Sequence, residues 1–572
     1  MKSFLFGVAA LLLGCAGLTA CSTSPTAPTA IRIRWTTDPQ TLDLLLASNS
    51  QALEVINLLH CSLLVGDSRS RTFVPWLAQS MPIVSRRDSL TLLTYSLRPE
   101  ATWDDGQPVL ARDVAYTLKV LNCPGLPTEY MRAQYGFVLD IELDAANQRR
   151  FTLVCNGASQ DVIMASGDYA ILPERNLDPR GELRLVPLPL LRTDTAAAVR
   201  RFPALREFAR RYQRARPDRQ PGCGPYTLTA WESNRYLRLQ RKPNWWARNV
   251  RNAPPWLQAH AARLDYRIIP DNATALLALR RGDIDLYPMP PARDFNQLRR
   301  SADTTRLTFQ VADSYNMTTV GFNTQRPALR DPLTRRALSM LFDVPGLMRA
   351  TQPELAYRSV SLISPQDKLS YNDSLPLLAF NPAGALQLLA RAGWQRRPDG
   401  TWWRGGTRQL AFGVSYRAGD SEYETIALQF RAAAARIGIL VRLLPTETGL
   451  LQQQLVAGDI DMYVRTFYGN IFGYNFMPIL HSRGIGVINY TRFQDPESNQ
   501  LIEAITAEQN KLRQARLLRR FQSLLRRESP LVVLYFTRHR LIASRRLRPV
   551  QATRVRPGYD ALSLELAPPA ER

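Results

Sequence analysis

Residues 97–118 read LRPEATWDDGQPVLARDVAYTL, and this stretch divides into three elements. It begins as a strand, and Asp104-Asp105-Gly106 is foremost a turn signal rather than a pair of catalytic carboxylates. Val114, Leu118 and Leu121 follow at helical spacing, which predicts a helix with one buried face. A strand, a tight turn and an amphipathic helix in close succession favour an α/β protein.

A helix–turn–strand pattern occurs at two places further along the chain. Residues 279–287 read LRRGDIDLY, and residues 455–463 read LVAGDIDMY. In the first copy Asp271 can cap a helix, Gly282 can end it in the left-handed conformation, and a strand follows. A helix stopped by glycine is common, so a chance echo is the alternative. We favour two comparable α/β lobes, which would leave a cleft for a ligand between them.

The length of 572 residues is enough for about three compact units, and a hydrophobic fraction of 45% supports large cores. The formal charge of +24 is unusual and first suggests nucleic acid or an anionic membrane as a partner. Only five of the 73 basic residues are lysines, however, although lysine also serves a phosphate surface. A genome-wide codon bias explains the arginine excess at least as well as function does.

The first 21 residues are typical of an export signal. Lys2 gives a basic start, and the apolar run over residues 4–13 is too short to span a membrane stably. The sequence LTAC at residues 18–21 resembles the lipobox of bacterial lipoproteins, in which the chain is cut before the cysteine and that cysteine is acylated. A conventional signal with a chance cysteine is the alternative. We expect a signal peptide over residues 1–20, then a lipid anchor on Cys21 and a tether, together residues 21–30.

A location outside the cytoplasm argues against nucleic acid as the natural partner and permits disulfide bonds. The four cysteines left after lipidation allow buried free thiols or one or two bridges, and both alternatives stay open. They are Cys61, Cys123, Cys155 and Cys223. The arginine pairs Arg210-Arg211 and Arg526-Arg527 are expected on solvated helix faces.

Motifs for catalysis are not found in the sequence. It contains no G-x-S-x-G, no H-E-x-x-H and no phosphate-binding G-x-x-x-x-G-K. The four histidines are scattered, and His60-Cys61 beside Leu58-Leu59 fits a core pair better than a metal site. We therefore expect no enzyme activity, no metal and no cofactor.

The stretch at residues 97–118 resembles the signature of the family-5 extracellular solute-binding proteins, the receptors of oligopeptide, dipeptide and nickel ABC importers. Further stretches are similar to this family in the same order along the chain. They are PGCGPY at 221–226, in which Cys223 replaces a threonine, RIIPD at 267–271, GFNT at 321–324, LRD at 329–331, RRAL at 335–338 and ARAGW at 390–394. The ordered set extends over about residues 31–550 and is far more specific than any single match.

The resemblance implies an α/β, two-lobed periplasmic-binding-protein-like fold with a hinge and a subdomain inserted in the first lobe. The implied first lobe comprises residues 31–65, 220–310 and 531–572, and the inserted subdomain comprises residues 66–219. Residues 311–530 form the second lobe. Because the chain crosses the hinge twice, the lobes are expected to close on the ligand as rigid bodies. Family members hold peptides largely through backbone hydrogen bonds.

One position departs from the dipeptide and oligopeptide receptors, in which an aspartate after a second-lobe strand pairs with the ammonium of the ligand. Asn470 falls at that position here. An amide offers no countercharge to a buried ammonium, so we expect no strict preference for free peptide amino termini. The same stretch supplies the other expected contacts. They are an aromatic pocket of Phe467, Tyr468 and Phe472, together with Tyr474, and a hydrogen-bonding Asn475. The alternative is that half of these aromatic residues belong to the core.

The sequence therefore predicts a monomeric, lipid-anchored receptor of an ABC importer, exported to face the periplasm or the exterior of a bacterial cell. Its expected ligand is a peptide or a peptide-like polar solute, and its expected partner is the membrane permease. Receptors for a nickel chelate or an oligosaccharide are alternatives with the same fold. A ligand sensor or an adhesin without a role in transport is a further alternative. The arginine excess would also tolerate an anionic ligand.

Overall fold

The computed structural model describes residues 30–44, 47, 49–67, 72–157, 160–215, 220–469 and 474–568. The predicted signal peptide and Cys21 lie outside these residues, as do Asn470 and Phe472. Within the described ranges, no helix has both the length and the apolar character needed to cross a membrane.

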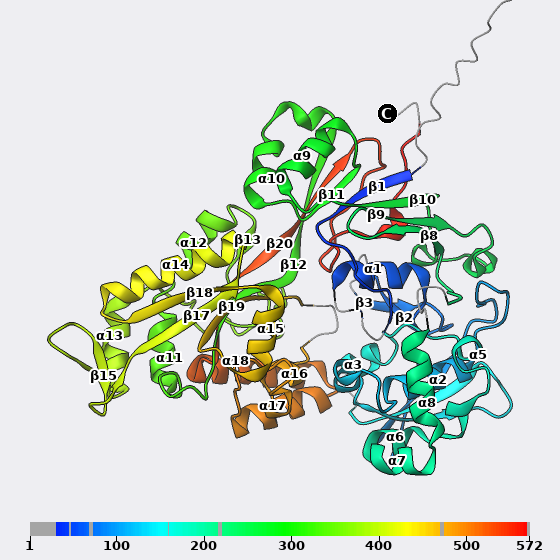
Figure 1. Ribbon diagram of the computed structural model, residues 1–572, viewed down its shortest axis with the longest axis horizontal. Helices are drawn as coiled ribbons and strands as arrows, with labels where there is room; N and C mark the ends of the chain where they lie inside the picture. The colour runs from blue at the N-terminus through cyan, green and yellow to red at the C-terminus, as the bar shows by residue number, and fades with distance from the viewer. Residues whose placement is uncertain are drawn as a thin grey trace, which may run out of the picture.

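An 11-stranded sheet extends through the molecule (Figure 1). Its strand order is β18-β17-β19-β12-β20-β11-β1-β10-β9-β8, and β13 pairs with β20. The strands are β1 (Ala30–Trp35), β8 (Tyr226–Glu232), β9 (Tyr236–Arg241), β10 (Arg263–Ile268), β11 (Leu286–Pro288), β12 (Leu307–Phe322), β13 (Ala356–Tyr357), β17 (Ala411–Arg417), β18 (Leu440–Thr446), β19 (Met462–Phe467) and β20 (Leu531–Ser544).

The two long strands β12 and β20 join two parts of this sheet. β20 pairs with β11 at one end, and β12 pairs with β19 at the other. The register between β12 and β20 shifts between Asp313 and Met317, where a bulge interrupts the ladder. We call the part with β1 and β8–β11 the first lobe and the part with β17–β19 the second lobe. Figure 1 shows the lobes connected by β12 and β20.

Helices cover the sheet in both lobes. The first lobe has α1 (Ser50–Leu59), α9 (Asn272–Arg281) and α10 (Ala292–Arg299). The second lobe has α11 (Pro332–Ser339), α12 (Val344–Thr351), α13 (Pro382–Arg391), α14 (Ser421–Arg436), α15 (Thr448–Ala457), α16 (Met477–Leu480), α17 (Pro496–Ala507) and α18 (Lys511–Glu528). It also carries a small sheet of β14 (Gln395–Arg396), β15 (Trp402–Arg404) and β16 (Arg408–Gln409).

The repeated sequence pattern is confirmed as one helix–strand unit in each lobe. α9 begins with the Asp271 side chain accepting the Thr274 amide at 2.7 Å. It ends at Gly282, and α15 ends at Gly458, with φ values of 76° and 82°. Because these left-handed values cost an L-residue energy, glycine is the residue that stops both helices. β11 follows α9 in the first lobe, and β19 follows α15 in the second.

A subdomain between α1 and β8 has its own sheet, with the order β4-β5-β7-β6, and a separate β2-β3 pair. Its strands are β2 (Leu64–Asp67), β3 (Thr72–Pro75), β4 (Ile83–Arg87), β5 (Leu90–Ser96), β6 (Val138–Leu143) and β7 (Arg150–Cys155). Its helices are α2 (Ala111–Leu121), α3 (Glu129–Gln134), α4 (Gln160–Ala165), α5 (Glu174–Leu177), α6 (Leu188–Thr193), α7 (Thr195–Arg201) and α8 (Ala204–Arg214). The residue boundaries assigned to lobes and subdomain from the sequence stay a prediction.

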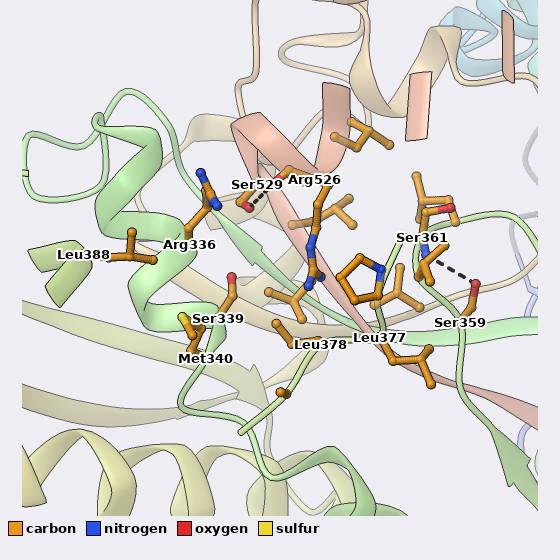
Figure 2. A pocket seen from close by; sticks show the side chains of 18 residues that line it. Arg336, Ser339, Met340, Ser359, Ser361, Leu377, Leu378, Leu388, Arg526 and Ser529 are labelled. Carbon is orange, nitrogen blue, oxygen red and sulfur yellow. Dashed lines mark hydrogen bonds between the residues drawn. The ribbon is translucent and has the colours of Figure 1, made fainter. Parts of the chain in front are cut away.

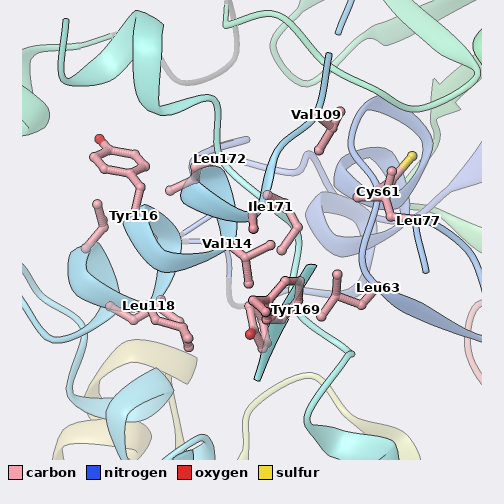
Figure 3. Packing of buried hydrophobic residues seen from close by; sticks show 14 of the residues in the cluster. Cys61, Leu63, Leu77, Val109, Val114, Tyr116, Leu118, Tyr169, Ile171 and Leu172 are labelled. Atoms are coloured by element: carbon pink, nitrogen blue, oxygen red, sulfur yellow. The ribbon is translucent and has the colours of Figure 1, made fainter. Parts of the chain in front are cut away.

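The helix predicted from residues 97–118 is confirmed as α2. Val114, Leu118 and Leu121 are buried in one hydrophobic cluster that also contains Tyr169 and Ile171. Figure 3 shows Val114 of α2 beside Ile171 and Tyr169 in this core. The apolar spacing therefore places α2 with its buried face on the subdomain core.

Two of the sequence motifs contact each other where the subdomain joins the first lobe. Asp104 accepts a hydrogen bond from the Gly222 amide at 2.9 Å and donates its own amide to the Gly222 carbonyl at 3.0 Å. Asp104 also forms an ion pair with Lys242. The Gly224 amide donates to the Leu59 carbonyl at 2.9 Å. Asp104 therefore holds the turn against the 221–226 segment, which is a structural role.

All four cysteines in the described residues are buried free thiols. Cys61 and Cys223 are neighbours, and the Cys61 thiol donates to the Cys223 carbonyl at 3.0 Å. Burial raises the pKa of Cys61, Cys123 and Cys155, to about 12 for the last two. These three thiols therefore stay protonated near neutral pH and are poor nucleophiles.

A buried carboxyl ties the first lobe to the C-terminal segment, which we define as residues 545–568. Glu54 of α1 accepts hydrogen bonds from Trp35 Nε1 at 3.2 Å and from the Tyr266 hydroxyl at 3.0 Å. The Tyr559 hydroxyl of the C-terminal segment also donates to Glu54. Burial raises the pKa of Glu54 to about 7, although all three donors act in the opposite direction.

The stability contributed by Glu54 is expected to fall as the pH rises. Its pKa is about 7 in the folded protein against an ordinary value of 4.5, so the unfolded chain loses this proton first. The contribution is fully present below about pH 4.5 and is lost by about pH 7. Relative to wild type, Glu54→Gln should gain about 2.5 kcal/mol in unfolding free energy from pH 5 to pH 8. Urea unfolding of both proteins at both pH values measures this gain. If the difference in unfolding free energy between Glu54→Gln and wild type were the same at pH 5 and pH 8, the prediction would be contradicted.

Candidate functional site

The crossing of β12 and β20 between the lobes is irregular and polar. Ser314 Oγ donates to the Thr537 carbonyl at 2.7 Å, and Asn316 Nδ2 lies 2.9 Å from His539 Nε2. His539 Nδ1 lies 2.8 Å from the Thr553 carbonyl, so Nδ1 carries the proton and Nε2 accepts from Asn316. Burial lowers the pKa of His539 to about 4, which keeps the ring neutral near pH 7. These bonds tie the crossing strands to the C-terminal segment.

A second polar network lies along the same crossing. Glu422, at the start of α14, accepts hydrogen bonds from the Thr318 and Tyr535 hydroxyls at 3.1 and 2.9 Å. It also accepts from Gln352 Nε2 at 2.6 Å, and Gln352 Oε1 accepts from Arg540 Nη1 at 2.5 Å. Burial lowers the pKa of Arg540 to about 10, so the guanidinium stays charged near pH 7. Glu422 supplies the negative charge that favours this buried cation.

Among the predicted site residues that the structure describes, Tyr468 has a contact with the C-terminal segment. It follows β19 directly and is 53% exposed, and the Arg556 guanidinium lies 3.5 Å from the centre of its ring. Arg556 belongs to the C-terminal segment, and its Nη1 donates to Ser50 Oγ at the start of α1 at 3.4 Å. Phe467, one residue earlier, pairs with Met317 of β12 and is half-buried against the second-lobe core. The described part of the predicted stretch thus brings one exposed ring to a cation from the first lobe.

The remaining predicted residues have other surroundings. Asn475 is exposed, and its Oδ1 accepts the amide of Met477, the first residue of α16, at 3.1 Å. Tyr474 donates its hydroxyl to Asp367 Oδ2 at 2.7 Å and stacks on Phe476 with 5.9 Å between ring centres. Tyr474 therefore packs against the second-lobe core, and the assignment of the other aromatic residues to a pocket stays a prediction. Two predicted contacts, Asn470 and Phe472, lie outside the described residues.

Several residues around Tyr468 were not predicted from the sequence as part of a site. The Arg417 guanidinium lies 5.8 Å from the centre of the Tyr423 ring, and the Tyr423 hydroxyl donates to Thr466 Oγ1 at 3.0 Å, two residues before Tyr468. We define the inter-lobe junction as Arg417, Tyr423, Thr466, Tyr468 and Arg556. Arg556 precedes Pro557-Gly558, a pair that predicts a turn. Such a local pattern does not predict which part of the fold the turn contacts. Only the packing of the C-terminal segment places that arginine on Tyr468.

The subdomain contacts the second lobe at another place. A cavity of about 280 Å³ is lined by Arg86 of β4, by residues of and after α17, and by Leu517 of α18. The two parts of the chain that flank this cavity are far apart in sequence. They meet because the lobes face each other in this arrangement.

The chemistry available at the inter-lobe junction is binding chemistry. Its groups are aromatic rings, hydroxyls and guanidiniums, which stack on flat groups and hydrogen-bond to polar ones. Among the residues that the structure describes, no three or more His, Cys, Asp or Glu side chains are grouped so that they could hold a metal ion.

The chain matches the family model described as bacterial extracellular solute-binding proteins, family 5 middle, over residues 72–484. Peptidoglycan-binding protein YepA of Agrobacterium fabrum is 22% identical over 495 residues, which cover 78% of this chain and 73% of that protein. Oligopeptide-binding protein AppA of Bacillus subtilis is 24% identical over 331 residues, which cover 55% of this chain and 56% of that protein.

Solved structures share the fold over nearly the whole chain. The structure of AppA from Bacillus subtilis in complex with a nonapeptide has a TM-score of 0.73 at 19% identity, and the match covers 94% of this chain and 99% of that chain. The periplasmic EDTA-binding protein EppA has a TM-score of 0.77 at 18% identity, and the match covers 94% of this chain and 96% of that chain. The predicted two-lobed α/β architecture is thus confirmed. Since the family model extends over most of its length, the chain belongs to the family-5 extracellular solute-binding proteins of bacteria.

Proposed function

We propose that this chain is the substrate-binding receptor of an ABC importer and that it captures a peptide or peptide-like polar solute between its lobes. Family membership supports the role in transport. The contact between Tyr468 of the second lobe and Arg556 of the C-terminal segment supports the position of the ligand site. Opening of the lobes about β12 and β20 would separate this pair and free both side chains for a ligand.

The proposal includes export and a lipid anchor on Cys21. The LTAC sequence at residues 18–21 supports acylation, and the short polar stretch up to β1 would serve as the tether. A tethered receptor would stay close to its permease. Asn470 in place of an acidic residue supports a ligand without a free ammonium at that point.

Native mass spectrometry of the full-length protein, extracted from membranes without refolding, tests the proposal. We expect a peptide-like mass bound non-covalently and a chain that begins at an acylated Cys21. Tyr468→Ala should weaken binding of the copurified ligand about tenfold, because a stacking surface is lost, and should leave the melting temperature of the ligand-free protein nearly unchanged.

Tyr236→Ala is the matched control for Tyr468→Ala. The Arg238 guanidinium lies 4.5 Å from the centre of the Tyr236 ring on β9, so this variant also removes a tyrosine–arginine contact, but one that lies within the first lobe. Equal ligand retention in both variants would contradict the assigned site. Turnover of added peptides by the pure protein would contradict the receptor role.

A further inference from the structure

A cavity of about 260 Å³ lies within the second lobe (Figure 2). Its walls are α11, α13, α18, the start of β20 and the segment that follows β13. None of the five residues that define the inter-lobe junction lines this cavity. It is therefore a separate place in the fold, next to the start of β20.

Two arginines lie on the wall of this cavity without an acidic partner. Figure 2 shows Arg526 of α18 extending into its middle, with Arg336 of α11 on one side. Neither forms an ion pair with any residue in the described ranges. Burial lowers the pKa of Arg526, and the positive charges of Arg336 and Arg358 lower it further. Like charges thus converge on a partly desolvated space, which is unfavourable unless an anion compensates them.

The neighbouring Arg527 shows how unusual Arg526 is. Arg527 is exposed and pairs with Glu497 and Glu528 at 2.8 and 2.9 Å. Of the two arginines expected on a solvated face, Arg527 is exposed, whereas Arg526 is half-buried and lines the cavity. Successive helical residues are about 100° apart around the axis, so one of the pair faces solvent and the other faces the cavity.

The remaining wall is apolar or accepts hydrogen bonds. Four buried serines contribute hydroxyl oxygens, and they are Ser339, Ser359, Ser361 and Ser529. Each hydroxyl donates its hydrogen to a protein acceptor at 2.6–3.1 Å, so none of these hydrogens is left for a ligand. The Ser359 and Ser361 oxygens also accept backbone amides at 3.2 and 3.3 Å. Leu378 and Val532 are among the apolar residues of the wall. The two guanidiniums are consequently the donors that face a ligand.

We propose that this cavity binds a small organic anion with an apolar body. Its phosphate or carboxylate group lies between Arg336 and Arg526 and accepts their charge-assisted hydrogen bonds. Its apolar part packs against the side of the cavity formed by Leu378 and Val532. This site is independent of the solute held between the lobes.

Hexyl phosphate and hexanoate are suitable probes, with hexanol as the uncharged comparison. On the full-length protein, isothermal titration calorimetry should show binding of at least one anion and a rise in melting temperature. Arg526→Gln should weaken that binding at least about tenfold, because a charge-assisted contact is lost. Arg516→Gln removes the same charge from an exposed position of α18 and should leave binding unchanged.

The melting temperature without ligand distinguishes a binding role from a structural one. Because Arg526→Gln removes repulsion from Arg336 and Arg358, the ligand-free variant should melt no lower than wild type. Equal affinity in Arg526→Gln, no binding of either anion, or equal binding of hexanol would overturn the proposal. Loss of anion binding in Tyr468→Ala but not in Arg526→Gln would place the anion at the inter-lobe junction instead and would also overturn it.

Discussion

Replacing Glu422 by leucine is expected to lower the free energy of unfolding by about 3–5 kcal/mol. The carboxylate accepts hydrogen bonds from Thr318, Tyr535 and Gln352, and leucine accepts none of them. Three donors would lose this acceptor at once, although Thr318 and Tyr535 keep a second partner in Thr466 and Thr351. Arg540 would also keep its charge in a buried position without the negative group that favours it.

Urea unfolding of the ligand-free protein measures the effect of Glu422→Leu. Glu424→Gln is the matched control, because Glu424 is exposed on the same helix, and it should change stability by less than about 0.5 kcal/mol. Glu422→Gln should lie between the two, since its amide oxygen still accepts a hydrogen bond while its amide group carries no charge. A loss below about 1 kcal/mol for Glu422→Leu would show that solvent replaces the network.

Replacing Gly224 by alanine is expected to cost about 3 kcal/mol of stability through steric overlap. A Cβ at this position would lie 2.4 Å from the Leu58 carbonyl oxygen and 2.7 Å from the Leu59 carbonyl carbon. Both atoms belong to the backbone of α1 and its end, so no side-chain rotation relieves the overlap. The Gly224 amide also donates to the Leu59 carbonyl at 2.9 Å, and a shift of the chain would weaken that bond.

Gly449→Ala is the control for Gly224→Ala. Gly449 lies in the first turn of α15, and a Cβ there would approach only the flexible Glu447 side chain, at 3.1 Å. Alanine favours the helix, so this variant should be neutral or slightly stabilising. Thermal unfolding of the two variants compares them, and equal stability would mean that the chain near Gly224 adjusts without cost.

Elements with local signals could be predicted from the sequence. The Asp271 cap and the Gly282 stop define α9, and the apolar spacing from Val114 to Leu121 defines α2. Cap hydrogen bonds, left-handed glycines and helical periodicity all depend on residues only a few positions apart, so a short segment of sequence is enough to recognise them. The candidate site was predicted only in part. Tyr468 was predicted because it is an aromatic residue in the stretch that resembles the ligand-binding segment of the family. No local pattern pointed to Arg417 or Tyr423.

The sequence by itself determined the helix–strand units, the ordered motifs and through them the family of this protein. Only the tertiary structure decided which distant residues meet. Ser50 and Arg556 are 506 residues apart and lie within 3.4 Å, and Arg556 covers Tyr468 of the second lobe. Arg526 faces a cavity while its neighbour Arg527 faces solvent. The reason is physical: such contacts depend on how whole lobes pack, and the energy of packing is shared among many residues rather than carried by any short pattern.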